Sequence, residues 1–408
     1  MTLTQVSKFD APTAGRGTPN PAPKPALKAR IKAAAAVAAK HADRIDAEAL
    51  FPTEAFDAIR AHGLLSLLVP AELGGESASM SDVADVCFAL GQACASTGMI
   101  YAMHQTKLAC ITRHGLESEW HREFLRRVAD EQLLLASSTT EGQGGGNVRS
   151  SAAAVQYDGE AISLERAATC ISYGLQADGL VTTARRANDA ADSDQVLLVL
   201  HEQDYTLDKI QGWNTMGMRG TCSSGFLVKA KGVAAQILPE PYEKIHLQTM
   251  VPTAHMLWGS VWAGIAACSV ERARQFLRNA ARQAEGRLPP GAAHFTNASA
   301  GLKALRGLIG AALRRFESSD PKAAALPSLE FQTSMTLLKV EASERAVEIA
   351  LTALRACGLS GYRNDGAFSV SRNLRDALSS PIMINNDRIL ANLGSASLLE
   401  EAPASLFD

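Results

Sequence analysis

The spacing of apolar residues divides the chain into three stretches. Up to about residue 135, apolar residues recur at helical spacing, as at Phe56, Ile59 and Leu64. Between about 136 and 245 the pattern changes to short β-branched runs separated by Gly, Asp and Asn, which favours strands. After about residue 246 the helical spacing returns over long segments. The pattern therefore predicts a mainly α chain with a central β-domain.

Individual elements and domains are predicted from the same spacing. Ser81 and Asp82 are typical caps for a helix over 83–95, and Gly115 ends a helix over 99–114. Other expected helices cover 26–40, 254–280, 298–316 and 331–356. One more helix is expected to start at Phe51-Pro52, and a last one to follow Asp387. The expected strands cover 152–155, 180–183, 196–199 and 225–229. The expected domains are a disordered tail at 1–25, a helical domain at 26–135, the β-domain at 136–245 and a four-helix-bundle domain at 246–408.

The composition excludes several classes of function. The chain has 408 residues, is 47% hydrophobic and 20% charged, and has a formal net charge of -2. These values are typical of a globular protein and give no basic field for nucleic acid. The seven cysteines are scattered without a C-x-x-C pair, so we expect reduced thiols, a cytoplasmic protein and no metal site. No long uninterrupted apolar run predicts a membrane span.

A glycine-rich segment after the apolar run at 133–135 is the first candidate site. Four of the five residues at 142–146 are Gly, and Ser138, Thr140 and Asn147 flank them with hydrogen-bonding side chains. Glycine lets the backbone approach a ligand closely, so the segment predicts contact with a flat, polar-edged cofactor. The spacing matches neither the G-x-x-x-x-G-K-[ST] loop nor G-x-G-x-x-G, and a flexible surface loop is the alternative.

A second segment, 217–221, reads Gly-Met-Arg-Gly-Thr. Together the two segments resemble patterns of the acyl-CoA dehydrogenase superfamily. Thr140-Glu141, Gly145 and Asn147 fit its T-E-x-x-x-G-[ST]-[DN] loop, and 217–221 fits its G-M-R-G-[ST] turn.

A third segment, 361–377, is similar to the family pattern G-Y-x-x-x-[YF]-P-V-x-R-x-x-R-D-A. Two residues are added after Tyr362, and Ser369 stands where Pro is usual. The matching residues are Gly361, Tyr362, Phe368, Val370, Arg372, Arg375, Asp376 and Ala377. The three segments follow the family's order, within a resemblance over roughly residues 30–400 that implies the acyl-CoA dehydrogenase-like fold.

The resemblance implies a flavin against the β-domain. In the strand after the glycine-rich segment the family usually has [WF]-I-[TS]-N, and this chain has Cys170-Ile171-Ser172-Tyr173. Ser172 keeps a hydroxyl that can bond the flavin ring near N5, whereas Cys170 replaces the aromatic residue that stacks on it. The implied cofactor-binding residues are Ser138, Thr140, Gly145, Gly146, Asn147, Ile171, Ser172 and Gly361, and the implied substrate-binding residues are Arg219, Thr221 and Ile384.

The resemblance also implies a catalytic base. Most family members remove an α-proton with a Glu beyond the R-D-A sequence, and here that position is Ile384. A smaller group has the Glu early in the long central helix, where residues 251–256 contain no carboxylate. Three candidates remain: Asp387, His255, and His104, which matches a histidine region in flavin monooxygenases that resemble this family. The alternatives are a helix cap for Asp387 and core packing for each histidine.

The cofactor and the reaction are left open at this point. The resemblance implies FAD, with FMN supplied in reduced form as the alternative. Residues 282–291 lack the Phe-Gly part of the family's R-x-x-F-G clamp, which would weaken FAD retention and fits the alternative. The enzyme either oxidises the CH–CH group of an acyl-CoA-like substrate with an atypical base, or is a two-component monooxygenase in which His104 bonds the oxygenated flavin. A non-catalytic flavin-binding protein is a minor alternative. The resemblance further implies a homotetramer and, as partner, a flavin reductase or an electron-transfer flavoprotein.

Overall fold

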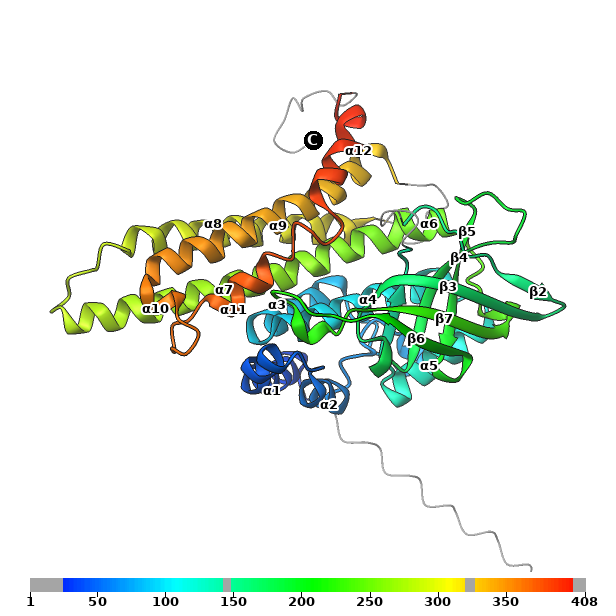
Figure 1. The fold of residues 1–408 in the computed structure, drawn as a ribbon, viewed down its shortest axis with the longest axis horizontal. Helices are drawn as coiled ribbons and strands as arrows, with labels where there is room; N and C mark the ends of the chain where they lie inside the picture. Colours follow the sequence, from blue (N-terminus) through cyan, green and yellow to red (C-terminus); the bar gives the residue numbers. More distant parts are fainter. Residues whose placement is uncertain (1–24, 142–147, 320–326, 399–408) are drawn as a thin grey trace, which may run out of the picture.

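The expected order of a helical domain, a β-domain and a helical bundle is confirmed (Figure 1). The computed structural model describes residues 25–141, 148–319 and 327–398. The expected tail, apart from residue 25, and the candidates Gly145, Gly146 and Asn147 lie outside these ranges. Within the described ranges, no helix has both the length and the apolar character needed to cross a membrane.

The N-terminal domain is helical. Its α-helices are α1 (Leu27–Glu48), α2 (Thr53–Ala61), α3 (Met80–Ala93), α4 (Ala95–His114) and α5 (Glu119–Glu131). The expected cap at Ser81 is wrong, because Ser79 caps α3. The Ser79 hydroxyl accepts from the Asp82 N–H at 3.0 Å, and the Asp82 carboxylate accepts from the Ser79 N–H at 3.0 Å. Gly115 follows α4 as expected.

The β-domain has two sheets. In the three-stranded sheet, β1 (Leu135–Ser138) runs parallel to β4 (Gly179–Arg185), which pairs antiparallel with β5 (Gln195–His201). The other sheet is antiparallel and has the order β2 (Gln156–Asp158), β3 (Ala161–Ile171), β7 (Ser224–Val233) and β6 (Tyr205–Gln211). The expected strand at 152–155 is wrong, since only Ala154 forms an isolated bridge there.

The C-terminal domain is built on long helices. Its α-helices are α6 (Tyr242–Ile245), α7 (Val251–Gln283), α8 (Ala292–Ser318), α9 (Leu329–Cys357), α10 (Leu359–Tyr362), α11 (Ser371–Ala377) and α12 (Asn386–Ser397). A π-helix, His246–Met250, joins α6 to α7, and its end residues keep helical backbone angles. The chain therefore continues from α6 through the π-helix into α7 without a break.

Helix α4 is the element that positions the site. Nearly all of its residues are buried, because it contacts both α7 of the bundle and β1 of the β-domain. Figure 1 shows α4 between the long C-terminal helices and the strands. A helix that is covered on every side has no polar face, which agrees with the mixed, mostly apolar sequence of α4.

Candidate active site

A cavity of about 600 Å³ lies where the three domains meet. Its wall is formed by α4, the end of β1, the end of β3 and the residue that follows it, the segment 213–223, the π-helix with the first turns of α7, and the segment 375–384. Ligand-binding pockets usually have volumes of roughly 300–1,000 Å³. The cavity is therefore large enough for a small organic molecule or for part of a cofactor.

Three hydroxyl groups form a row on the β-domain side of the cavity. The Thr221 hydroxyl donates to the Met218 carbonyl at 2.8 Å, and Ser223 Oγ lies 2.7 Å from both Thr221 Oγ1 and Ser172 Oγ. Each hydroxyl has one proton to donate. Because the Thr221 proton is used on Met218, Ser223 donates to Thr221 and Ser172 donates to Ser223. The Ser172 oxygen is thus left as an acceptor toward the cavity.

Basic groups lie on the helical side of the cavity. Lys107 of α4 is 4% exposed, and its ammonium contacts the Met250 sulfur at 3.3 Å. Burial lowers the pKa of Lys107 to about 8. Burial, followed by the positive charges of Arg149 and Lys107, lowers the pKa of the nearby His246 to about 3. Among the described residues that line the cavity there is no Asp or Glu, so no carboxylate there neutralises this side.

His255 of α7 also lines the cavity. Its Nδ1 lies 2.9 Å from the Met335 carbonyl oxygen, which can only accept, so Nδ1 carries the proton in the neutral ring. Burial lowers the pKa of His255 to about 4, so the ring is neutral near pH 7. The remaining nitrogen, Nε2, is therefore a hydrogen-bond acceptor.

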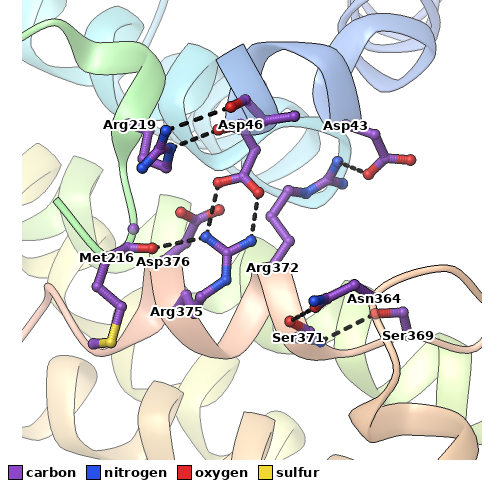
Figure 2. Close-up of polar contacts among 12 residues, drawn as sticks. Asp43, Asp46, Met216, Arg219, Asn364, Ser369, Ser371, Arg372, Arg375 and Asp376 are labelled. Atoms are coloured by element: carbon purple, nitrogen blue, oxygen red, sulfur yellow. Dashed lines mark hydrogen bonds and ion pairs between the residues drawn. The ribbon is translucent and has the colours of Figure 1, made fainter. Parts of the chain in front are cut away.

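Polar contacts fix the segment that carries Met218. The Met218 N–H donates to the Asp376 carboxylate at 2.7 Å, and Arg375 donates to the Met216 carbonyl at 2.7 Å. Arg375 also pairs with Asp46 of α1. Figure 2 shows Arg375 facing Asp46 and the Met216 carbonyl where this segment, α11 and α1 meet. The Gly-Met-Arg-Gly-Thr turn and the Arg-Asp-Ala sequence are thus joined directly.

Ile384 lies in the cavity wall between α11 and α12. Its backbone has a φ of 51°, and its carbonyl accepts from the Lys339 ammonium at 2.9 Å. Lys339, which is fully buried, also donates to Asn386 Oδ1 at 2.6 Å. A buried ammonium therefore holds in place the segment where the resemblance puts the catalytic Glu, and the side chain there is apolar.

The structure brings some of the sequence-predicted residues to the cavity and leaves others outside it. Those that line the cavity are Thr140, Ser172, Thr221, His255 and Ile384. Those in the described ranges that do not line it are Ser138, Ile171, Gly361, Arg219, His104 and Asp387.

Strand alternation explains two of the residues outside the cavity. Ser137 and Thr139 line the cavity, so Ser138 points to the other face of β1, where it is fully buried. Cys170 and Ser172 line it likewise, and Ile171 between them is fully buried. At both places the cavity is therefore lined by the neighbouring residues and not by Ser138 or Ile171.

His104 and Arg219 have backbone partners instead of a place at the cavity. His104 Nε2 lies 2.8 Å from the Leu65 carbonyl oxygen, and its Nδ1 accepts from the Leu135 N–H at 3.0 Å. The Arg219 guanidinium donates to the Asp46 carbonyl at 2.6 Å. Both ring nitrogens of His104 are used, so the structure supports the packing interpretation of this histidine.

Asp387 and Gly361 belong to helix ends. Asp387 is exposed in the first turn of α12, and its N–H donates to Asn385 Oδ1 at 2.8 Å, which fits the alternative of a helix start. Gly361 is buried in α10, where a Cβ would lie 2.6 Å from the Cys357 Cβ.

Glu141 of the T-E pair has a structural role. It is 7% exposed, accepts from the Ser151 hydroxyl at 2.9 Å and from the Ala152 N–H at 2.6 Å, and lies 3.1 Å from Arg166. These contacts anchor the chain on both sides of residues 142–147. The buried carboxylate therefore positions Thr140 and does not act as a free base.

Sequence reasoning missed Lys107 and His246. A signal for Lys107 was present, since a lysine in the mostly apolar segment 99–111, without Asp or Glu nearby in the sequence, rarely lies in a core unless it has a function. His246 gave no signal of its own, because a helical histidine is usually a packing residue.

Comparison with known proteins agrees with this fold. Residues 26–132 match the acyl-CoA dehydrogenase N-terminal domain, and residues 249–399 match the acyl-CoA dehydrogenase C-terminal domain. The chain belongs to the acyl-CoA dehydrogenase family. Its members include relatives of two kinds, whose sequence identities to this chain are nearly equal.

A cyclohex-1-ene-1-carbonyl-CoA dehydrogenase of Geobacter metallireducens is 25% identical over 366 residues, covering 88% of this chain and 93% of the relative. A probable FMNH2-dependent monooxygenase, SfnC, of Pseudomonas putida is 24% identical over 368 residues, covering 86% and 89%. The crystal structure of TdsC from Paenibacillus sp. A11-2 with FMN and indole aligns with a TM-score of 0.77 at 19% identity, over 94% of this chain and 99% of that chain. Members of this family are flavin-dependent oxidoreductases, and the chain belongs to that class of protein.

Proposed function

We propose that the chain is the oxygenase of a two-component flavin-dependent monooxygenase. The observation that carries this proposal is the cavity wall, which has no carboxylate among its described residues and includes Ile384, where the resemblance puts the usual base. Residues 142–147, which the structure does not describe, contain no Asp or Glu either. Dehydrogenation of an acyl-CoA requires a base within reach of the α-carbon, whereas monooxygenation does not.

The residues of the β-domain fit a flavin. The hydroxyls of Thr139, Thr140 and Ser172 line the cavity and can bond the polar edge of the flavin ring. When bound in reduced form, the flavin supplies electrons and activates O2 so that one oxygen atom is transferred to the substrate. Apolar side chains of Met99, Met103 and Trp258 limit water on the helical side.

The row of hydroxyls supports binding of the reduced form. Ser172 presents only lone pairs to the cavity, since its proton is donated to Ser223. Reduced flavin has an N–H at N5, where oxidised flavin has a lone pair. An acceptor at Ser172 therefore favours the reduced flavin, which a separate reductase would supply.

The missing clamp supports the same proposal. Residues 282–291 lack Phe-Gly, so the family's contact to the FAD pyrophosphate is incomplete. We infer that the cofactor is FMN, which has no pyrophosphate, and the names of SfnC and of the TdsC complex both refer to FMN.

Dehydrogenation of an acyl-CoA is the second candidate, and the similarity to the Geobacter enzyme favours it. His255 would then be the base, because its Nε2 is an acceptor at the cavity. Burial lowers the pKa of His255 to about 4, however, which makes it a weak base near pH 7. A general base works best when its pKa is close to the working pH, so this mechanism is the less favourable one.

One experiment separates the two candidates. The protein is loaded with oxidised FMN or FAD, made anaerobic and mixed with butyryl-CoA or cyclohexanecarbonyl-CoA. In a second arm, a flavin reductase supplies reduced FMN in air with indole or benzoate, and mass spectrometry searches for a product with one added oxygen atom. We expect oxygenation in the second arm and no loss of flavin colour in the first. Bleaching by an acyl-CoA, without oxygenation, would establish the dehydrogenase instead.

A further inference from the structure

Lys107 is a buried cation without a carboxylate partner in the described residues. Its ammonium has three N–H donors, and its one hydrogen-bond partner in the described residues is the Met250 sulfur at 3.3 Å, a weak acceptor. Burying a charge without a partner is costly, and proteins usually pair or neutralise such groups. An apolar residue at position 107 of α4 would avoid this cost, as Met103 does one turn earlier.

Two arginines, Arg149 and Arg166, act electrostatically on the groups at this end of the cavity. His246, on the π-helix, is close enough that the charges of Lys107 and Arg149 lower its pKa, after the larger effect of burial. Burial is the largest cause of the lowered pKa of Lys107; Cys110 raises this pKa and the charge of Arg166 lowers it further. The carboxylate of Glu141 is already used by Arg166 at 3.1 Å. This end of the cavity thus attracts a negative charge from outside the protein.

We propose that Lys107 and His246 form an anion-binding subsite, and that the substrate is a small organic acid with a carboxylate or sulfonate group. The acid group accepts from the Lys107 ammonium, and the rest of the molecule lies against the apolar wall that includes Trp258. This inference adds a class of substrate to the proposed function. It rests on that proposal in one respect, namely that the cavity is the substrate site.

The phosphate of FMN is the other possible source of an anion at this place. The hydroxyls that fit the flavin, Thr139, Thr140 and Ser172, come from the β-domain, whereas Lys107 and His246 come from α4 and the π-helix. Lys107 and His246 therefore lie on a different part of the cavity wall from the hydroxyls that fit the flavin, and we assign these two residues to substrate binding.

The test is binding of matched probes to the full-length protein, measured by calorimetry without flavin. Benzoate and benzenesulfonate carry the acid group, and benzyl alcohol has the same ring without the charge. We expect the two acids to bind at least about tenfold more tightly than benzyl alcohol, as a charge-assisted hydrogen bond in a buried site predicts. Equal or weaker binding of the acids would overturn the proposal, and this comparison needs no variant.

A variant locates the effect. In Lys107→Met we expect the Kd for both acids to rise about tenfold or more, while the Kd for benzyl alcohol stays unchanged. The melting temperature is expected to hold or rise, because an unpaired buried charge has been removed. Lys244→Met is the matched control, since Lys244 pairs with Glu240 at 2.8 Å and does not line the cavity. Unchanged acid binding in Lys107→Met contradicts the subsite.

Two further results distinguish the possible failures. If Lys107→Met weakens FMN but not riboflavin, the anion is the flavin phosphate, and the substrate assignment is wrong. If indole is oxygenated while the acids do not bind, the monooxygenase stands and the subsite fails. If the acids bind through Lys107 and no oxygenation of either probe occurs, the subsite stands and the proposed reaction fails.

Discussion

Gly217 lies directly against the backbone of Arg375, so that a Cβ at position 217 would be 2.1 Å from the Arg375 carbonyl oxygen. This contact joins the two family motifs beneath the cavity, where Met218 and Asp376 are also bonded. Position 217 thus requires Gly because the Arg375 backbone leaves no room for a Cβ, and not because of the backbone angles at position 217.

Replacing Gly217 with Ala is expected to lower the free energy of unfolding by about 1–3 kcal/mol, because the turn or α11 must move to relieve the overlap. Gly212→Ala is the matched control, since a Cβ there meets nothing within 4 Å. Urea unfolding followed by circular dichroism compares the two variants. A loss of equal size in both would mean that the contact with Arg375 is not the cause.

Replacing Ser223 with Ala is expected to shift the flavin preference toward the oxidised form. Without Ser223, the Ser172 hydroxyl keeps its proton and can donate it to N5 of oxidised flavin. We expect the ratio of the Kd for oxidised FMN to that for reduced FMN to fall about fivefold or more, as one hydrogen bond of about 1 kcal/mol predicts. Anaerobic fluorescence titrations give both constants. Ser379→Ala, at the cavity but outside this row, should leave the ratio unchanged.

Replacing Ile384 with Glu is expected to introduce acyl-CoA-dependent flavin bleaching. The new carboxylate would stand where the resemblance puts the family's usual base, and a positioned base typically contributes about 10²- to 10⁴-fold to the rate. Absorbance of bound FAD after mixing with butyryl-CoA measures the gain. Ile382→Glu adds the same charge to the same wall and serves as control. Equal bleaching in both variants would argue against a specific base position.

The affinity for organic acids is expected to fall above pH 8. Burial lowers the pKa of Lys107 to about 8, so its ammonium loses the proton that holds the anion as the pH rises from about 7 to about 9. Of the groups around it, Arg166 stays protonated, His246 stays neutral because its pKa is lowered to about 3, and Cys110 stays neutral because burial raises its pKa to about 11.

Calorimetry with benzoate at about pH 7 and about pH 9 checks this expected loss of affinity. The Kd should rise about tenfold at the higher pH, as the protonated fraction of a group with a pKa near 8 requires. Benzyl alcohol should show no change. A Kd for benzoate that is constant over this range would mean that Lys107 is not the group that binds the acid.

The helical and β segments were predictable because most of them keep a regular spacing of apolar residues. The spacing did not predict strand β3, although the resemblance indicated a strand at Cys170-Ile171, and the reason is physical. Its inward positions include Arg166, which is 1% exposed, so the alternation of apolar and polar residues is broken where Glu141 supplies a buried partner. That partner lies far away in the sequence, and no local pattern reveals it.

The candidate site was predictable on the β-domain side and not on the helical side. Thr140, Ser172 and Thr221 followed from motifs, and they line the cavity. On α4, His104 was chosen although Lys107 lines the cavity. A helix buried all round has no polar face, so periodicity cannot show which side of it meets a cavity and which side packs against strands.

The π-helix at His246–Met250 decides which side chains reach the cavity. Its last hydrogen bond joins the Val251 N–H to the His246 carbonyl, five residues apart, and both residues line the cavity. In an α-helix, side chains five residues apart point in directions that differ by about 140°. A π-turn brings them close to one direction. Removing one residue between them would restore the α-helix and leave His246 and Val251 four residues apart, with directions that differ by about 40°. The π-turn therefore accommodates one extra residue in this segment while both side chains still line the cavity.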